Sequence, residues 1–132
     1  MTVQVGNTKD YYDLVTQWWI GHKFPVVPSD MLPKHLFVVH NDSGELTHFM
    51  FIYHTNSNLC WLAFPVSNPN LSKEDRKGCL GGMMKAPVEY CKQMGFKYVF
   101  TTSPVEAIQS KLTSVGFQLG DEGVNHYIKI IK

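Results

Sequence analysis

The chain has few charged residues, and neither sign of charge is in excess. Twelve Lys and Arg residues stand against eleven Asp and Glu residues, and charged residues make up 17% of the sequence. Proteins that bind nucleic acid or acidic lipid usually carry a basic excess or a basic run. The balance of charge therefore predicts no nucleic-acid partner and no membrane partner.

Long apolar runs and paired cysteines are also missing. No run approaches the roughly 18–20 residues of a membrane-spanning helix, and the opening "MTVQVGNTKD" lacks the basic and apolar regions of a secretory signal. The three cysteines, Cys60, Cys79 and Cys91, are odd in number and widely spaced, which does not suggest a disulfide framework. A reducing, cytoplasmic location is the simplest expectation.

The usual spacings of metal ligands are absent as well. Neither a C-x-x-C nor an H-x-x-x-H pair occurs in the sequence. His40, His48 and His54 lie around one expected hairpin and would meet only through its register. We interpret them as solvated or capped hairpin residues and expect no metal site.

What the chain does contain is enough apolar surface for a core. Hydrophobic residues make up 44% and aromatic residues 13% of its 132 residues, which argues against disorder and for one domain over residues 1–132. Periodicity predicts a mixed, mostly antiparallel α/β sheet flanked by helices, in the order β-α-β-β-β-α-β-α-β. Strands are expected at 2–5, 35–40, 45–55, 59–66, 96–102 and 125–131, and helices at 9–22, 72–95 and 103–117.

Two details of this pattern carry further predictions. The helix between the strands at 59–66 and 97–101 is a crossover connection, so these two strands should be parallel neighbours. Trp18 and Trp19 cannot both point straight inward from one helix. One of them should sit at the helix edge, against another element, a substrate or a partner subunit, which would favour a homodimer; simple packing of both rims in the core is the alternative.

The stretch "RKGCLGGMM", residues 76–84, places three glycines in five positions at the start of an amphipathic helix. An interior glycine costs a helix about 0.5–1 kcal/mol relative to alanine. A loop with bare backbone amides for a phosphate would explain this cost; a tight turn or close packing would explain it without a ligand. In a third interpretation, Ser72 and Asp75 form a capping box and start one long helix. The amides near Gly81 would then be hydrogen-bonded to carbonyls one turn back and could not bind a phosphate. The glycines and Pro87 make that helix costly and favour the loop.

The order of elements, together with "FKYVFTTSPVEAIQSKLTSVGFQLGD", resembles the GNAT superfamily of acyl-CoA-dependent N-acyltransferases. Val115, Gly116 and Phe117 occupy the place of the "LGF" that ends the last helix of that family. The run from Asn68 to Arg76 is similar to that of short, divergent GNAT-like proteins of tailed phages. The resemblance implies an N-acetyltransferase that uses acetyl-CoA as cosubstrate and acts by direct transfer on a small-molecule or protein amine.

The resemblance also implies a cosubstrate site. The phosphate motif of the family, Q/R-x-x-G-x-G/A, is matched at Arg76 and Gly81, whereas Cys79 replaces the first glycine and Gly82 adds another. Amides of Cys79–Gly82 would then bind the pyrophosphate, as helix N-termini do, with Arg76 beside it. Pro65 would mark the place where two strands part for the pantetheine arm, with Phe64, Val66 and Ser103 as contacts; an ordinary strand end also explains this proline.

The catalytic residues of the family are less well matched. Leu112 stands where a tyrosine acid is usual, and the strand "LCWLAFPV" has no carboxylate base. His54 is a candidate base and Ser110 a candidate polar group, while the loop at 24–34 would shape the acceptor site. The same departures support an alternative, a catalytically degenerate GNAT-fold binding or interaction protein. A nucleic-acid-modifying relative is disfavoured by the neutral charge.

Overall fold

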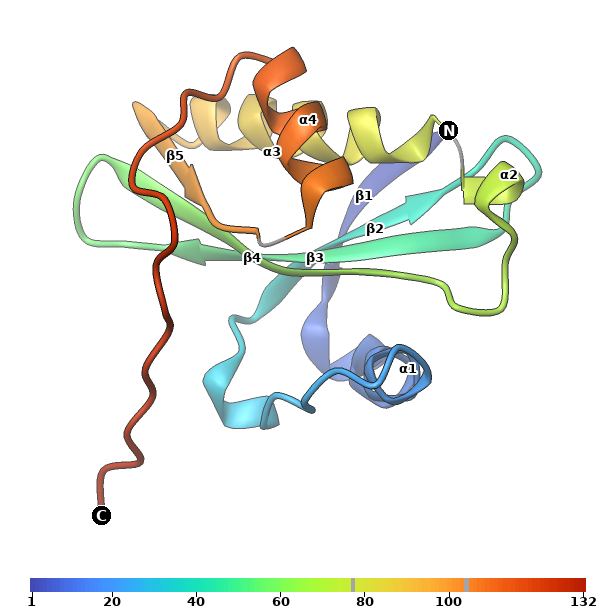
Figure 1. Cartoon of the computed structure of the whole chain (residues 1–132), viewed down its shortest axis with the longest axis horizontal. Helices are drawn as coiled ribbons and strands as arrows, with labels where there is room; N and C mark the ends of the chain where they lie inside the picture. The colour runs from blue at the N-terminus through green and yellow to red at the C-terminus, as the bar shows by residue number, and fades with distance from the viewer. Residues whose placement is uncertain (77, 104) are drawn as a thin grey trace.

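Figure 1 shows the computed structural model, which describes residues 1–76, 78–103 and 105–132. Its strands and helices follow the expected order up to the last helix, and a short 3-10 helix interrupts the proline-rich loop. The elements are β1 (Thr2–Asn7), α1 (Thr8–Gly21), the 3-10 helix (Ser29–Met31), β2 (His35–His40), β3 (Leu46–His54), β4 (Leu59–Ser67), α2 (Lys73–Arg76), α3 (Cys79–Gln93), β5 (Tyr98–Thr101) and α4 (Glu106–Ser114).

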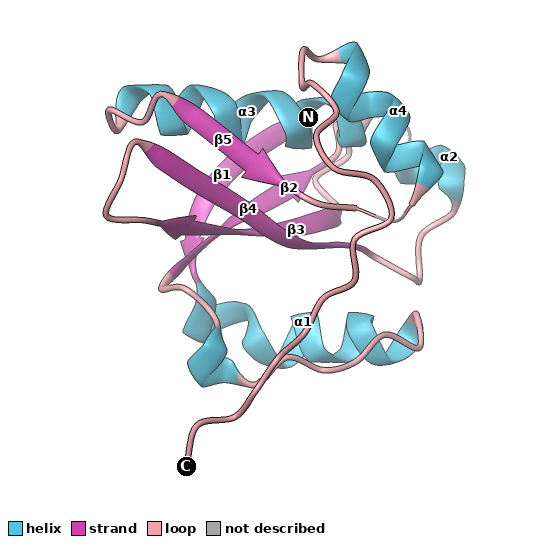
Figure 2. Ribbon diagram, turned by 60° about the vertical axis from the view of Figure 1, so that its left-hand side comes forward, coloured by secondary structure: helices cyan, strands magenta, loops and turns pink. Residues whose placement is uncertain are grey.

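The sheet has five strands in the order β1-β2-β3-β4-β5. The first four are antiparallel to their neighbours, and β5 pairs with β4 in parallel, as predicted from the α3 crossover. The helices α3 and α4 cover one face of the sheet, and α1 covers the other (Figure 2). The predicted fold class, a mostly antiparallel sheet flanked by helices, is therefore confirmed.

Each face of the sheet has its own apolar cluster, because side chains alternate along a strand. On the α3 face, Phe37, Met50 and Leu62 pack with Met83 and Met84. On the α1 face, the tryptophans and Val15 pack against residues of three strands, β2, β3 and β4. These two clusters fix α1 and α3 on opposite sides of the sheet.

The expectation that one tryptophan would sit at the helix edge was wrong. Trp18 and Trp19 are only 2% and 3% exposed. Their rings lie 4.6 Å from Phe49 and 6.0 Å from Phe51, centroid to centroid. Two neighbouring residues of a helix can both be buried here because the sheet face beneath α1 is wide and lined with aromatic rings. The tryptophans therefore give no reason to expect a dimer.

Two expectations near the carboxyl end also differ from the structure. The closing strand at 125–131 does not form: residues 117–132 are described throughout and contain no helix or strand. The spacing of Ser103 and Glu106 is that of a capping box, with Pro104 as the first helical residue. However, α4 begins at Glu106 rather than Ser103, and this box is not made. The Oγ of Ser103 instead accepts a hydrogen bond from the backbone N–H of Val105. Pro104 lies outside the described residues.

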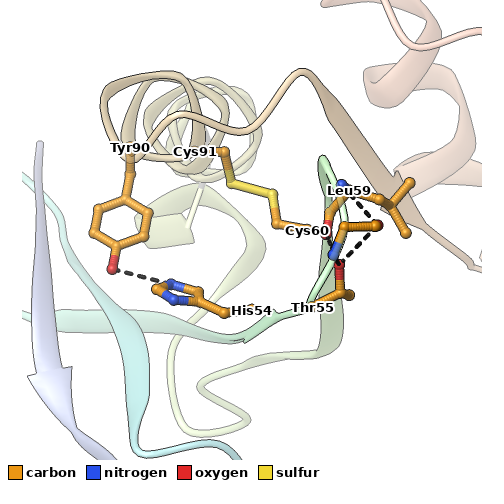
Figure 3. The surroundings of a disulfide bond; sticks show 7 residues. His54, Thr55, Leu59, Cys60, Tyr90 and Cys91 are labelled. Atoms are coloured by element: carbon orange, nitrogen blue, oxygen red, sulfur yellow. Dashed lines mark hydrogen bonds between the residues drawn. A yellow bond between two sulfur atoms is a disulfide. The ribbon is translucent and has the colours of Figure 1, made fainter.

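The cysteines correct the expectation drawn from their spacing. A disulfide joins Cys60 on β4 to Cys91 on α3, across the core of the α3 face (Figure 3). The third cysteine, Cys79, is free and buried. Wide spacing in sequence says little about distance here, because the crossover through α3 returns the chain to the strand it left.

The residues that the structure describes contain neither a candidate membrane-spanning helix nor a candidate metal site. None of their helices combines the length and the apolar character needed to cross a membrane. Their His, Cys, Asp and Glu side chains nowhere gather in a group of three or more that could hold a metal ion.

The buried histidine of β3 predicts a loss of stability in acid. Burial of His48, and then the positive charge of Arg76, lower its pKa from 6.5 to about 4. The unfolded chain therefore takes up this proton at higher pH than the folded chain. The contribution of neutral, buried His48 to the free energy of unfolding is therefore fully present above pH 6.5. As the pH falls from 6.5 to about 4, the free energy of unfolding decreases by about 3 kcal/mol.

Urea unfolding at pH 7, 5.5 and 4.5 would measure this effect. The variant His48→Gln keeps a polar side chain beside Thr47 but does not titrate. We expect its free energy of unfolding to fall less than that of the wild type over the same pH range. Equal slopes for the two proteins would show that His48 is not the responsible group.

Candidate active site

The parallel strands β4 and β5 part halfway along β4. Their pairing runs from Leu59 with Tyr98 to Leu62 with Thr101 and ends there. The hydroxyl of Thr101 donates a hydrogen bond of 2.9 Å to the carbonyl of Leu62, which closes the paired region. Because β4 continues to Ser67 while β5 ends at Thr101, the last five residues of β4 have no partner on β5. We call this place, where the pairing of the two strands has ended, the opening.

A β-bulge lies at the point where the strands part. On β3, Phe51 and Phe49 are two positions apart, but their partners on β4, Ala63 and Val66, are three apart. Phe64 lies in the stretch of β4 that has the extra residue. Its φ is positive, at 53°, a left-handed conformation that is costly for a bulky side chain. Strain of this kind concentrates at functional sites, so the bulge marks this opening as the first part of a candidate active site.

The second part is the start of α3. The one-turn helix α2 ends at Arg76, and Gly78 has a φ of 82°, so a new helix begins at Cys79. The hydroxyl of Ser72 accepts a hydrogen bond from the backbone N–H of Asp75, as in a capping box, and donates one to the Asp75 carboxylate, but this cap serves α2 alone. The single long helix from Ser72 is therefore wrong. The amides from Gly78 to Gly81 are the first of α3, so they have no hydrogen-bond partner within the helix. No side chain caps this helix either, and Gly82 lies just beyond these amides.

The three glycines have different reasons for being there. Gly78 needs its left-handed φ to separate the two helices. A side chain at Gly82 would meet the side chain of Met1. At Gly81 nothing lies within 4 Å of where a Cβ would be. Neither packing nor backbone conformation requires a glycine there, which leaves close approach of a ligand to the backbone as an explanation.

Polar side chains connect the end of β4 with the ends of α2 and α1. Arg76, the last residue of α2, donates a hydrogen bond of 2.6 Å from Nη1 to the hydroxyl of Ser67, the last residue of β4. The ring of His22, at the end of α1, lies 2.7 Å from the carbonyl of Ser67 through Nε2. The guanidinium is thus held at the end of the strand that carries the bulge.

The residues expected to contact the cosubstrate lie on β4, at the end of α2, at the start of α3 and just after β5. Phe64 and Ser103 each come two positions after the last pair of β4 and β5, so they stand on opposite sides of the opening. Val66 and Cys79 are 3% exposed, so only their backbone groups could contact a ligand.

The two expected catalytic side chains lie elsewhere. His54 pairs with Cys60 at the hairpin end of β4, four residues and so about 13 Å along the strand from Phe64. Its Nε2 is 3.2 Å from the hydroxyl of Tyr90 (Figure 3). Ser110 is exposed on α4. His54 is therefore distant from the bulge along the paired strands, and Ser110 is on a helix outside the sheet.

Two open cavities lie beside the proline-rich loop rather than at the opening. The larger, of about 450 Å³, is lined by the start of α1 and by Ser29, Leu32, Pro33 and Lys34. The smaller, of about 210 Å³, is lined by Pro33, Lys34, His35, Ile52 and His54. The loop expected to shape the acceptor site thus contributes to both, and His54 to one of them.

Sequence reasoning missed the aromatic side chains that link this loop to the bulge. The hydroxyl of Tyr53 donates a hydrogen bond of 2.9 Å to the carbonyl of Met31, and burial raises the pKa of this phenol, which keeps it a donor. Its ring stacks on Trp61 at 4.9 Å, and Trp61 lies 6.3 Å from Phe64. Strict alternation would place Trp61 and Phe64, three positions apart, on opposite faces of β4. The bulge in between brings both rings to the same side, which the sequence pattern did not reveal.

Comparison with known proteins adds to this geometry. No protein-family model matches the chain, and no curated protein matches its sequence. Solved structures do match. A crystal structure of a probable acetyltransferase has a TM-score of 0.71 at 13% identity, covering 100% of this chain and 99% of the other. The fold is that of the GNAT-like acetyltransferases.

Two aminoglycoside enzymes share this GNAT-like fold. One, from an uncultured soil metagenomic sample and in complex with trehalose, has a TM-score of 0.64 at 13% identity, covering 99% of this chain and 96% of its own. The other, aminoglycoside N-acetyltransferase AAC(6')-Iy in complex with CoA, has a TM-score of 0.60 at 16% identity, covering 98% and 100%. At such identities the likeness establishes the fold, and function must be argued from the site.

Proposed function

We propose that the chain, as one domain over residues 1–132, is an acetyl-CoA-dependent N-acetyltransferase that transfers the acetyl group directly to a small-molecule amine. One observation carries this proposal: β4 and β5 part at the Phe64 bulge, and the uncapped start of α3 lies beyond the end of the same strand. The opening would take the pantetheine arm, and the bare amides would take the pyrophosphate. A structural neighbour with bound CoA supports this choice of cosubstrate.

The state of the cysteines supports direct transfer. A covalent acetyl-enzyme would need an accessible nucleophile such as a thiolate. Cys60 and Cys91 are bonded to each other, and Cys79 is buried. The amine itself is therefore the proposed nucleophile, positioned by the site and relieved of its proton through water, because His54 lies about 13 Å along the strand from the bulge.

The acceptor is proposed from the side chains near the bulge. The aminoglycoside enzymes among the neighbours support a small-molecule amine. However, β2, β3, β4 and β5 contain no Asp or Glu to bind a polycation. Tyr53, Trp61 and Phe64 offer aromatic surface instead, and the indole Nε1 of Trp61 is buried without a hydrogen-bond partner among the described residues. We therefore propose an amine with an apolar or aromatic body.

Two measurements test the proposal in sequence. Calorimetry with acetyl-CoA tests the cosubstrate site, and release of free CoA in the presence of a panel of arylalkyl amines and aminoglycosides tests transfer. We expect binding, and turnover with the arylalkyl amines. Binding without turnover for any amine would favour the alternative, a GNAT-fold binding protein, which Leu112 in the usual place of the tyrosine supports. Absence of binding would contradict the proposal altogether.

The guanidinium of Arg76 should contribute to acetyl-CoA binding. The variant Arg76→Ala should weaken the affinity about 10- to 150-fold, the equivalent of a lost charged hydrogen bond of about 1.5–3 kcal/mol. It should also raise the pKa of His48, because the charge of Arg76 lowers it. The control Lys73→Ala removes an exposed cation from the same short helix and should change neither quantity. Equal affinities of the two variants for acetyl-CoA would show that Arg76 does not contribute to the cosubstrate site.

The cytoplasmic location expected from the sequence remains part of the proposal. Disulfides are rare in reducing compartments, so the bond between Cys60 and Cys91 makes this part directly testable. Alkylation of thiols in intact cells, followed by mass spectrometry, would report the state of both residues. Complete oxidation in growing cells would contradict a reducing location.

A further inference from the structure

The side chain of Arg76 is held by the protein at two points. Its Nη1 donates a hydrogen bond of 2.6 Å to the hydroxyl of Ser67, and its Nε donates one of 3.4 Å to the carbonyl of Ser72. Among the residues that the structure describes, no carboxylate makes an ion pair with this guanidinium. The half-buried side chain is therefore anchored by neutral groups, and its positive charge has no anionic partner.

An arginine anchored in this way is prepared to bind a phosphate. The two contacts use donors on Nη1 and Nε, so both N–H groups of Nη2 are left for a ligand. Arg76 comes two positions before Gly78, the first of the bare amides of α3. A long side chain that is ordered before the ligand arrives loses less conformational freedom on binding. The contact with Ser67 thus favours binding without touching the ligand.

Ser67 is itself held from the side of α1. Nε2 of His22 lies 2.7 Å from the carbonyl oxygen of Ser67. Because a carbonyl oxygen only accepts hydrogen bonds, Nε2 must carry a proton and donate it. The backbone N–H of the next residue, Asn68, donates a hydrogen bond of 2.8 Å to the carbonyl of Thr47 on β3. The backbone that presents the Ser67 hydroxyl to Arg76 is therefore held by both α1 and β3.

We propose that Ser67 and His22 are positioning residues of the cosubstrate site: Ser67 holds the guanidinium of Arg76 in place for the phosphates of acetyl-CoA, and His22 holds Ser67. The inference rests on the proposed function, because it takes Arg76 as a phosphate ligand. It adds that the end of α1, which covers the face of the sheet opposite α3 (Figure 2), contributes to the affinity for the cosubstrate.

Calorimetry with acetyl-CoA on a double-mutant cycle tests the role of Ser67. The variant Ser67→Ala should weaken the affinity about 3- to 10-fold, because the side chain of Arg76 must then be ordered during binding. Ser67→Thr keeps the hydroxyl and should bind as the wild type does. In the background of Arg76→Ala, Ser67→Ala should cause no further loss, since no guanidinium remains to be positioned. The control Ser43→Ala removes an exposed hydroxyl from the turn between β2 and β3 and should change nothing.

Two substitutions of His22 test the second link. The ring of His22 stacks on Phe24, with 5.1 Å between the ring centroids. His22→Phe keeps a ring for this stack but has no donor for the carbonyl of Ser67, so it should bind acetyl-CoA more weakly than the wild type. His22→Gln supplies an amide donor and should bind more tightly than His22→Phe. Equal affinities of these two variants would overturn the role of His22.

The imidazole of His48 gives a second measurement that needs no ligand. Burial and then the charge of Arg76 lower its pKa. Ser67→Ala should raise this pKa, measured by NMR titration, in the wild-type background by releasing the guanidinium. In the background of Arg76→Ala it should leave the pKa unchanged. A purely structural role of Ser67 would instead lower the melting temperature equally in both backgrounds and leave both cycles additive.

The possible results separate this inference from the proposed function. If the wild type binds acetyl-CoA and Ser67→Ala binds it equally well, or if the losses from Ser67→Ala and Arg76→Ala add, the positioning role is overturned and the proposed function stands. If the wild type does not bind acetyl-CoA, the proposed function fails and the positioning role fails with it. A loss that Ser67→Thr restores and that disappears in the background of Arg76→Ala supports both.

Discussion

Replacing Gly81 by glutamate should abolish the binding of acetyl-CoA, with at least a 100-fold loss of affinity, while the fold survives. The amides around Gly81 have no partner within α3, and the proposed pyrophosphate lies against them. A carboxylate at this point would occupy the position of the anion and repel it. The protein should fold because the space around a Cβ at Gly81 is open and because glutamate is a better helix former than glycine.

Two further variants make this result specific. Gly81→Ala adds only a methyl group: it should raise the melting temperature, since alanine favours a helix over glycine by about 1 kcal/mol, and should weaken acetyl-CoA binding less than glutamate does. Gln93→Glu adds the same charge at the far end of α3, about 18 Å away by helical rise, and should leave the affinity unchanged.

Calorimetry with acetyl-CoA and thermal melting of the four proteins provide the test. If Gly81→Glu bound acetyl-CoA as tightly as the wild type, the pyrophosphate would lie elsewhere. If Gln93→Glu lost affinity to the same extent, the effect would be one of overall charge. Either outcome would leave the glycine at position 81 without a functional explanation.

Reduction of the disulfide between Cys60 and Cys91 should lower the free energy of unfolding by about 3–4 kcal/mol. The bond links residues 31 positions apart, and loop-closure entropy in the unfolded chain predicts a contribution of this size. For a domain of this length the melting temperature should fall by roughly 10–15 °C. The bond also ties α3, whose start is the proposed phosphate site, to β4, which carries the bulge.

Calorimetric melting with and without a phosphine reductant would measure the effect. The double variant Cys60→Ala/Cys91→Ala should melt near the reduced wild type and should not respond to the reductant. The variant Cys79→Ala, which lacks the free buried thiol, should still respond. A reductant-independent melting temperature of the wild type would indicate that the bond is absent from the folded protein or does not stabilise it.

The sequence by itself determined the elements and their order as far as the last helix. Alternation predicted the strands of the meander, the apolar stripe predicted α3, and the crossover between two strands predicted that β4 and β5 are parallel. These features are local, or follow from connectivity alone. The glycine-rich stretch also argued against one continuous helix, because each glycine weakens such a helix; the structure puts the break at Gly78.

Tertiary structure decided the features that depend on a distant partner. The burial of both tryptophans depended on the width of the aromatic sheet face under α1. The disulfide depended on where the crossover places Cys91 relative to Cys60. The closing segment 125–131 has the composition of a strand but is unpaired in the structure, because a strand is stable only where a neighbouring strand satisfies its backbone. Composition and periodicity describe what a segment can form, whereas its neighbours in space determine what it does form.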